Sequence, residues 1–389
     1  MSTNKKIKIA VLGSTGSIGK TSLKIISKHR KKFDVSLLSC DKNFAVIFNQ
    51  IKKFKPLFAI VSDKKAYNKL LSRNLKNTLI FSSLEKFLLC KKNIIFDKTI
   101  LGISGTHGLD YAFSFVKISK KILLANKETI VCGGNIFIKQ AKKSNCLIEP
   151  LDSEHYCLKH LLVNINLKNI SSIYITASGG PFLKKNYKDF YKAKIKDSIN
   201  HPNWAMGNKI SVDSATMVNK ILEVIEASVL FDLNFDIIKI KIHEESKVHA
   251  AVSLKNGLTY MLAHDTSMEI PIRNSLFDEN FFNQKKLFFN SSRSFLFQFD
   301  EKNLKKFKII NSAYKIIRMG HRAHILFNEL NDHFVNRYLG GKIFFYEISK
   351  KLINIFKKPH IIKYCKKKVR NYSDIKASIN YAKIIAKEI

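Results

Sequence analysis

The sequence is poor in paired cysteines, in acidic residues and in long apolar runs. Its six cysteines are scattered over 389 residues and none forms a CxxC pair, which argues against a disulfide framework or a zinc site and indicates free thiols in a reducing compartment. No run of about 18 or more apolar residues occurs, so we expect no membrane-spanning helix and no membrane partner. Residues 1–13 lack the apolar core and small-residue cleavage site of a signal peptide, and we therefore expect a cytoplasmic protein.

Acidic residues are outnumbered: 30 Asp and Glu stand against 68 Lys and Arg, which gives a formal net charge of +38. Such a balance is also found in nucleic-acid-binding proteins. Here, however, the lysines are spread along the whole chain among many Ile, Asn and Phe, as in a protein encoded by AT-rich DNA, and arginine is scarce. We expect no nucleic-acid partner, and a basic nucleic-acid-binding protein is kept only as an alternative.

A glycine-rich turn follows the first apolar segment. Residues Lys8–Leu12 have the composition of a short buried strand, GSTGSIG (residues 13–19) follows at once, and the stretch to Ser27 has helical spacing. Strand, glycine-rich turn and helix form the opening of a dinucleotide-binding βαβ unit, in which small residues let the backbone approach a pyrophosphate. The glycine spacing is GxxGxxG instead of the commoner GxGxxG, so the prediction depends on the flanking strand and helix as much as on the motif.

The remaining pattern predicts an α/β protein with three structural parts. Short strand candidates alternate with helical stretches up to Pro150, which indicates a Rossmann-like, doubly wound parallel sheet. The residues after Pro150 indicate a central α+β domain, and the last part has the apolar spacing of a C-terminal helical bundle. The expected boundaries are 1–150, 151–277, 278–307 as a linker, and 308–389.

Residues 201–231 carry the highest density of chemically informative side chains. The second half has an apolar stripe at helical spacing, and Asn219, Lys220 and Glu223 cluster on another face of the same turns. An amide, a cation and a carboxylate on one rigid element are typical of an anionic-ligand site beside a metal ligand. A solvated helix face accounts for the helix equally well when it is taken alone.

Two further carboxylates follow an apolar strand. Asp152 and Glu154 are two residues apart, and on an extended segment they would point to the same side. With Glu223 they would supply three oxygen ligands, suited to Mg²⁺ or Mn²⁺ more than to zinc. A polar loop with surface carboxylates is the simpler interpretation of the pattern by itself.

Other polar residues lie at the ends of predicted elements. Ser178 opens a small-residue turn that can bind an oxyanion through backbone N–H groups, or can be a plain tight turn. Ser214 lies at an expected helix start, where it is either an N-cap or a phosphate ligand. Lys127 and Glu128 end a strand at the sheet edge where ligands bind, and His201, beside Trp204, is the histidine that we expect to touch substrate.

Five segments then carry a resemblance to a known family. They are GSTGSIG (13–19), LLANKE (123–128), DSEH (152–155), SGGPF (178–182) and HPNWAMGNKISVDSATMVNKILE (201–223). In order and spacing the sequence resembles the 1-deoxy-D-xylulose 5-phosphate reductoisomerase family, densely over residues 8–231 and more weakly to the end. The resemblance implies a homodimeric oxidoreductase that depends on NADPH and on Mg²⁺ or Mn²⁺. Its substrate would be a phosphorylated sugar, 1-deoxy-D-xylulose 5-phosphate, which it would isomerise and reduce to 2-C-methyl-D-erythritol 4-phosphate. This reaction belongs to the non-mevalonate pathway to isoprenoid precursors.

The resemblance also implies roles for individual residues. Cofactor contacts are implied for Thr15, Gly16, Ser17, Ile18, Lys42, Asn43, Asn126, Glu128 and Gly207. Metal binding is implied for Asp152, Glu154 and Glu223, which with Lys127 form the catalytic set. Contacts to the reacting end of the substrate are implied for Lys127, Ser153, Glu154 and Glu223. Contacts to its phosphate end are implied for Ser178, His201, Ser214, Asn219 and Lys220, and Trp204 would lie on a mobile loop over the substrate.

The sequence departs from the family pattern at several positions. Asp41 replaces a common glycine next to Lys42, the stretch 243–250 reads HEESKVHA instead of HPQSVIHS, and Glu269 replaces an arginine. Another NAD(P)-dependent dehydrogenase of a phosphorylated substrate is kept as an alternative, although the carboxylates and the phosphate cluster argue against it.

Overall fold

The computed structural model describes residues 5–73, 75–90, 93–204, 206–278 and 296–388. Within these residues the chain divides into two compact units, each made of segments that are separate in the sequence. The first unit comprises 1–129, 137–152 and 268–283, and the second comprises 130–136, 153–267 and 284–389. None of the described helices is long and apolar enough to cross a membrane.

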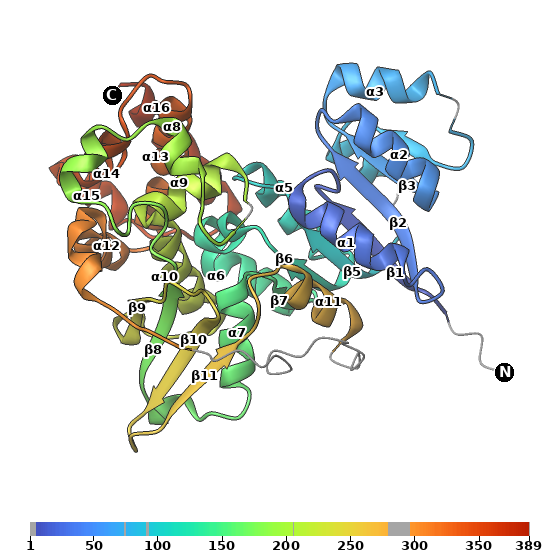
Figure 1. Cartoon of the computed structure of the whole chain (residues 1–389). Coiled ribbons are helices and arrows are strands. Elements are labelled where there is room, and N and C mark those ends of the chain that lie inside the picture. Colours follow the sequence, from blue (N-terminus) through green and yellow to red (C-terminus); the bar gives the residue numbers. More distant parts are fainter. Residues whose placement is uncertain (1–4, 74, 91–92, 205, 279–295, 389) are drawn as a thin grey trace. The chain divides into compact units, whose positions relative to one another are not determined.

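The first unit is built on a seven-stranded sheet in which all neighbouring strands are parallel (Figure 1). The strands are β1 (Ile7–Leu12), β2 (Phe33–Cys40), β3 (Phe58–Val61), β4 (Leu79–Phe81), β5 (Phe96–Leu101), β6 (Ser119–Leu124) and β7 (Leu147–Pro150). The helices between them are α1 (Ser17–Ser27), α2 (Phe44–Phe54), α3 (Lys64–Leu71), α4 (Leu84–Cys90), α5 (His107–Phe115) and α6 (Lys127–Lys143). The predicted doubly wound parallel sheet is confirmed.

The strand order places a ligand-binding edge beside the glycine-rich turn. The order is β4-β3-β2-β1-β5-β6-β7, so the direction of winding reverses between β1 and β5. Open α/β sheets bind ligands at the carboxyl ends of the strands at such a reversal. The GSTGSIG turn follows the carboxyl end of β1, and it therefore lies at this edge.

The turn depends on glycines at two positions. Gly13 has φ +76°, and a Cβ there would lie 2.6 Å from the carbonyl oxygen of Gly102. Gly19 lies in α1, where a Cβ would lie 2.5 Å from the Gly13 oxygen and from the Ser14 Cα. The absence of side chains therefore lets α1 pack directly against its own preceding turn.

A segment from late in the sequence completes the first unit. Helix α11 (Glu269–Phe277) packs on α1, where the Phe277 ring makes edge contacts with His29 and Phe33. Lys98 is buried and donates to the carbonyl oxygens of Ser275 and Leu276 at the end of this helix. No pattern in the sequence had indicated this return of the chain.

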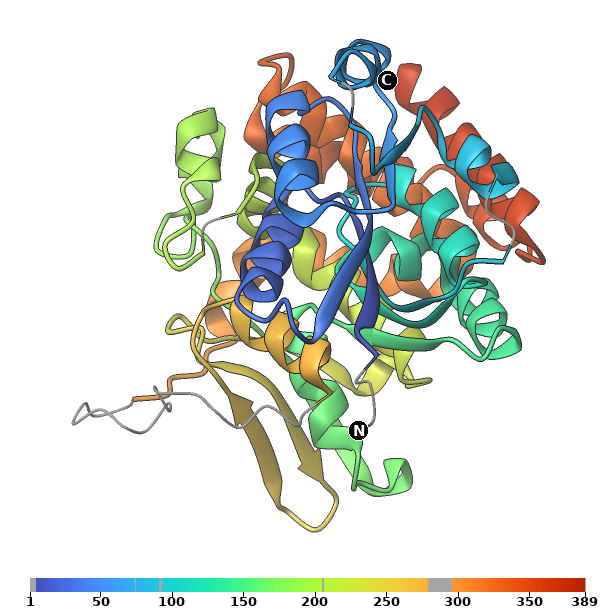
Figure 2. The ribbon, with the colours of Figure 1, turned by 90° about the vertical axis from the view of Figure 1, so that its right-hand side faces the viewer.

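The second unit contains a smaller sheet and most of the helices. Its strands are β8 (Ile170–Ala177), β9 (Ile238–Ile242), β10 (Val248–Leu254) and β11 (Thr259–Ala263), in the order β11-β10-β8-β9. Only the β8–β9 pair is parallel. Helices α7 (Ser153–Leu162) and α10 (Val218–Leu230) pack on β10 and β8, and Figure 2 shows β10 and β11 as a long hairpin. This is the predicted α+β arrangement.

The C-terminal part of the second unit is helical, as predicted. It contains α12 (Lys308–Arg318), α13 (His321–Leu339), α14 (Phe345–Ile355), α15 (Pro359–Cys365) and α16 (Tyr372–Lys387). Helix α13 packs against each of the other four. The division into 1–150, 151–277, 278–307 and 308–389 stays a prediction, and residues 279–295 of the expected linker lie outside the described part of the chain.

Gly19→Ala is expected to destabilise the first unit. The added methyl would overlap backbone atoms of the preceding turn, and overpacking of this kind typically costs about 1–3 kcal/mol. Chemical denaturation followed by circular dichroism measures the change. Gly16→Ala is the matched control, since the nearest atom to its Cβ would be 3.4 Å away. Equal stability of the Gly19→Ala protein and the wild type would show that the turn can relax.

Candidate active site

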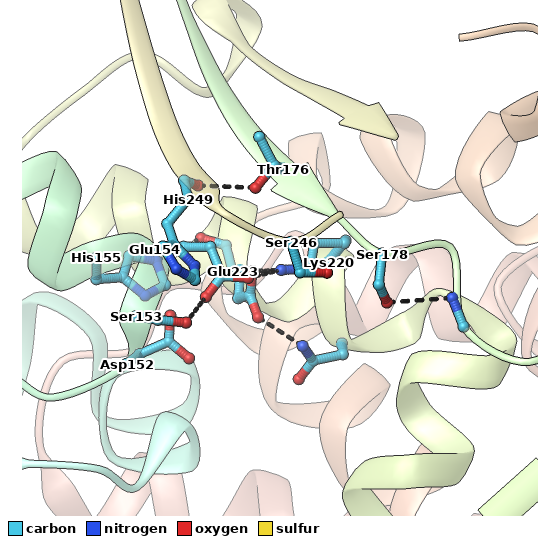
Figure 3. Close-up of polar contacts among 12 residues, drawn as sticks. Asp152, Ser153, Glu154, His155, Thr176, Ser178, Lys220, Glu223, Ser246 and His249 are labelled. Carbon is cyan, nitrogen blue, oxygen red and sulfur yellow. Dashed lines mark hydrogen bonds and ion pairs between the residues drawn. The ribbon is translucent and has the colours of Figure 1, made fainter. Parts of the chain in front are cut away.

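Three carboxylates from three places in the sequence meet in one group (Figure 3). Asp152 lies two residues after the end of β7, Glu154 lies in the first turn of α7, and Glu223 lies on α10. One oxygen from each carboxylate lies within 4.8 Å of the others. The order of residues along the chain brings Asp152 near Glu154, and the packing of α7 and α10 adds Glu223.

The local backbone differs from the prediction. An extended segment was predicted for Asp152 and Glu154, but α7 begins at Ser153. The two carboxylates are therefore brought together by a strand end and the first helical turn instead of by strand periodicity, so the predicted backbone was wrong. Ser153 donates its hydroxyl hydrogen to Glu154.

Lysine ammonium groups lie against all three carboxylates. Lys220 is paired with both Glu154 and Glu223, and Lys127 is paired with Asp152. Asn219 donates an amide hydrogen to Glu223, whose side chain is only 1% exposed. Three carboxylates with two ammonium groups retain an excess negative charge, and an all-oxygen donor set is the type that Mg²⁺ and Mn²⁺ prefer.

The His155 side chain fixes the helix that carries Glu223. Its imidazole is fully buried, and Nε2 donates to the main-chain carbonyl oxygen of Glu223 at 3.0 Å. Its Nδ1 lies 3.4 Å from a carboxylate oxygen of Glu226. His155 thus connects α7 to α10 and helps to fix the position of Glu223 relative to Glu154.

A second polar group surrounds the turn after β8. Ser178 is followed by Gly179 and Gly180, which both have positive φ, and its Oγ accepts a hydrogen bond from the Gly180 N–H at 3.2 Å. The Ser178 Oγ also lies 2.9 Å from Nε2 of His201. A Cβ on Gly180 would lie 3.1 Å from the main-chain oxygen of Ser214, so this turn packs on the helix that carries Ser214.

The tautomer of His201 follows from its neighbours. Its Nδ1 accepts hydrogen bonds from the backbone N–H groups of Asn203 and Trp204, both at 3.1 Å. The proton of the neutral ring therefore lies on Nε2, which donates to Ser178. Burial, and secondarily the charge of Lys220, lower the pKa of His201 to about 4, so the ring is neutral at neutral pH.

The helix expected to begin near Ser214 is two helices. Helix α9 (Asn208–Thr216) ends at Met217, which has φ +67°, and α10 begins at Val218. Ser214 thus lies inside α9 and is not an N-cap, so that part of the prediction was wrong. The break places Asn219 and Lys220 in the first turn of α10, where the helix dipole favours an anion.

Helix α9 is anchored to the C-terminal bundle. The buried Asp213 accepts a hydrogen bond from Asn331 on α13 at 2.8 Å. Lys209 bridges Asp213 and Asp332, with both ion-pair distances 2.8 Å. No role was predicted for these residues, although Lys209 and Asp213 lie in the informative segment 201–231, and their partners lie in the NELND segment, residues 328–332.

Two more histidines lie near the carboxylates. His249 on β10 stacks on His264 at 3.9 Å between ring centroids, and its ring is 6.1 Å from that of Trp204. Desolvation, followed by the charge of His264, lowers the pKa of His249 to about 4. His249 lies in the HEESKVHA segment (residues 243–250), but no role was predicted for it.

The residues expected to contact the cofactor lie mostly in the first unit. Thr15, Gly16, Ser17 and Ile18 form the end of the glycine-rich turn and the start of α1, and Lys42 and Asn43 lie between β2 and α2. Asn126 donates to the carbonyl oxygens of Ile103 and Gly105 at 2.6 and 3.1 Å, and Glu128 accepts from the Gly105 N–H at 3.2 Å. Gly207 belongs to the second unit, where it is the N-cap of α9.

Comparison with protein families finds three matching segments. Residues 9–134 match 1-deoxy-D-xylulose 5-phosphate reductoisomerase, residues 148–231 match its C-terminal domain, and residues 264–384 match the DXP reductoisomerase C-terminal domain. The 1-deoxy-D-xylulose 5-phosphate reductoisomerase of Pelagibacter ubique (strain HTCC1062) is 40% identical over 97% of this chain and 98% of that protein. The enzyme of Clostridium tetani (strain Massachusetts / E88) is 33% identical over 98% of each.

Solved structures give the same result. A DOX-P reductoisomerase crystallised with NADPH, fosmidomycin and magnesium matches with a TM-score of 0.89 and 30% identity, over 98% of each chain. The 1-deoxy-D-xylulose 5-phosphate reductoisomerase from Zymomonas mobilis in complex with NADPH matches with a TM-score of 0.83 and 26% identity, again over 98% of each chain.

Glu223→Gln is expected to weaken Mn²⁺ binding at least about tenfold, because loss of a direct ligand should cost no less than loss of a supporting residue. Isothermal titration calorimetry measures the affinity. Glu301→Gln is the control, since Glu301 is an exposed carboxylate paired with Lys241. Unchanged Mn²⁺ affinity in the Glu223→Gln protein would exclude this carboxylate as a ligand.

Proposed function

The chain belongs to the 1-deoxy-D-xylulose 5-phosphate reductoisomerase family, and we propose that Asp152, Glu154 and Glu223 hold the divalent cation of that reaction. The protein is an NADPH- and divalent-metal-dependent oxidoreductase. It converts 1-deoxy-D-xylulose 5-phosphate to 2-C-methyl-D-erythritol 4-phosphate in isoprenoid biosynthesis. The observation that carries the residue assignment is the approach of the three carboxylate oxygens to within 4.8 Å, beside a cluster of hydroxyl, amide and ammonium groups.

NADPH is the cofactor, and we assign it to the ligand-binding edge of the parallel sheet. Thr15, Gly16, Ser17 and Ile18 would contact its pyrophosphate through backbone N–H groups at the start of α1. Lys42 and Asn43 would contact the adenosine 2′-phosphate, with the exposed Lys42 supplying the favourable charge. Asn126, Glu128 and Gly207 complete the proposed set.

The substrate phosphate is assigned to the group around the turn after β8. The proposed ligands are Ser178, His201, Ser214, Asn219 and Lys220. Lys220 is paired with Glu154 and Glu223, and a cation bound among the carboxylates would compete for the same oxygens. We infer that, with a cation bound, the Lys220 ammonium would be able to turn toward the phosphate, so that binding of the cation would favour binding of the phosphate.

The residues at the reacting end orient the substrate and keep water out. The cation, when bound, polarises the carbonyl and hydroxyl oxygens of the substrate while the skeleton rearranges, and NADPH supplies the hydride. Ser153, Glu154 and Lys127 would position the reacting carbons. Trp204 follows the His201 segment and approaches His249, so closure of this segment would exclude water from the reaction.

A homodimer in the cytoplasm is proposed on separate grounds. Strand β11 is an edge strand of its sheet, and Leu258, Tyr260 and Met261 are all about half exposed. An exposed apolar edge strand is a favourable surface for pairing with a second copy. The free cysteines are consistent with a reducing compartment.

The reaction itself gives the first test. Purified protein is expected to oxidise NADPH only when 1-deoxy-D-xylulose 5-phosphate is present, as followed by NADPH absorbance. EDTA should abolish the reaction, because the carboxylates then have no cation to offer the substrate, and excess Mn²⁺ or Mg²⁺ should restore it. Full activity in excess chelator would contradict the proposed metal site, and substrate-independent oxidation would contradict the proposed activity.

Lys220→Ala is expected to raise KM for the substrate about tenfold or more. A charge-assisted hydrogen bond contributes roughly 1.5–3 kcal/mol, and about 1.4 kcal/mol corresponds to one decade. Steady-state kinetics measure the change, with Lys239→Ala on the exposed side of β9 as the control. Since Lys220 also contacts two proposed metal ligands, Mn²⁺ affinity is measured in parallel. An unchanged KM would remove Lys220 from the phosphate site.

A further inference from the structure

The second unit contains a cavity of about 250 Å³ outside the residues assigned to cofactor, cation and substrate. Buried aromatic rings line one part of it. Phe190 lies between Phe307 and Phe345, at ring-centroid distances of 5.7 and 5.6 Å. The rings of Tyr191 and Tyr346 also line the cavity and lie 4.3 Å apart. Tyr191 is 50% exposed, so a ligand entering from solvent can reach the ring surfaces.

Four lysines line the same cavity: Lys306, Lys308, Lys350 and Lys357. Among the described residues that line it, none is an aspartate or glutamate. Lys306 is fixed in place, because its ammonium donates to the main-chain oxygens of Leu183 and Lys185. A concentration of ammonium groups without a lining carboxylate produces a positive potential that favours an anion.

Two of the lysines lie on one helix and in the turn that follows it. Lys350 lies on α14, and Lys357 follows two residues after the end of that helix. Both line the cavity, Lys350 from the helix and Lys357 from the turn beyond its end. Lysines are common over this whole chain; the aromatic lining and the lack of a lining carboxylate separate this group from an ordinary basic surface.

The cavity is next to the substrate-phosphate residues in the fold but does not include them. Its wall contains Thr216, the last residue of α9. The Thr216 hydroxyl donates to the Asp213 carbonyl oxygen at 3.2 Å and accepts from the Val218 N–H at 3.4 Å, so it spans the break between α9 and α10. None of Ser178, His201, Ser214, Asn219 and Lys220 lines the cavity.

We propose that this cavity is a second ligand site, which binds a small organic phosphate ester. The phosphate group lies among Lys306, Lys350 and Lys357, where charge-assisted hydrogen bonds are available. The organic part rests on the rings of Phe190 and Tyr191. The volume is below the roughly 300 Å³ at which sites for drug-sized ligands begin, so the organic part is small.

The test uses the full chain and phenyl phosphate, whose two halves match the two parts of the lining. Binding is measured by isothermal titration calorimetry on the wild type and on two double variants. In Lys350→Ala/Lys357→Ala we expect the site to weaken about tenfold or more, because charge-assisted hydrogen bonds to the phosphate are lost. The matched control is Lys351→Ala/Lys358→Ala, which removes the same charge at the same spacing from residues that do not line the cavity. The control is expected to bind as the wild type does.

Two further probes separate the contributions of the lining. Phenol, which lacks the phosphate, and inorganic phosphate, which lacks the ring, should each bind more weakly than phenyl phosphate. The proposal is overturned if Lys350→Ala/Lys357→Ala binds phenyl phosphate as the wild type does, or if either half of the probe binds as tightly as the whole. Without the probe, both double variants should retain wild-type turnover. Because binding of phenyl phosphate is measured directly, the result does not depend on whether the proposed catalytic residues are correct.

Discussion

Repulsion among three neighbouring carboxylates is the constraint on which the site depends. A buried charge is costly unless it is paired, and Glu223 is almost completely buried beside Glu154. The second unit meets this constraint with Lys220 and Asn219 from the same helix turn. His155 adds a hydrogen bond that holds α10 against α7. Each of these contacts fixes the relative position of the two helices, so the electrostatic requirement and the packing of the unit are satisfied by the same residues.

The break between α9 and α10 is the second structural requirement. A continuous helix would have no N-terminus at Val218, and Asn219 and Lys220 would lose the favourable end of a helix dipole. The left-handed backbone of Met217 makes the break, and the Thr216 hydroxyl bridges it. Helix α9 is held in turn by α13 through Asp213 and Asn331. The C-terminal bundle thus supports the proposed substrate site although it contributes none of the proposed ligands.

The departures from the family pattern have different structural consequences. Glu269, which replaces an arginine, begins α11 and is paired with Lys24 on α1 at 2.7 Å. Arg273, one turn later, lies 3.4 Å from the same carboxylate. The acidic residue is therefore part of the contact between α1 and α11 within the first unit. Asp41 is exposed next to Lys42, where solvent screening would reduce its repulsion of the 2′-phosphate proposed to bind there.

The class of fold and the chemical types of the site residues could be predicted from sequence patterns alone. Strand runs such as those of β1 and β2 are largely apolar because parallel strands are covered on both faces, and the glycines of the 13–19 turn allow the close packing of α1 on the end of β1. The family motifs also predicted that Asp152, Glu154 and Glu223 bind one metal ion together. Periodicity could not show the helical start at Ser153 or the break at Met217, because both depend on local backbone conformations that the neighbouring packing selects. Three features are visible only in the tertiary structure. They are the return of α11 to the first unit, the anchoring of Asp213 by α13, and the aromatic cavity with its lysines. Each joins residues far apart in the chain, and no local pattern encodes such contacts.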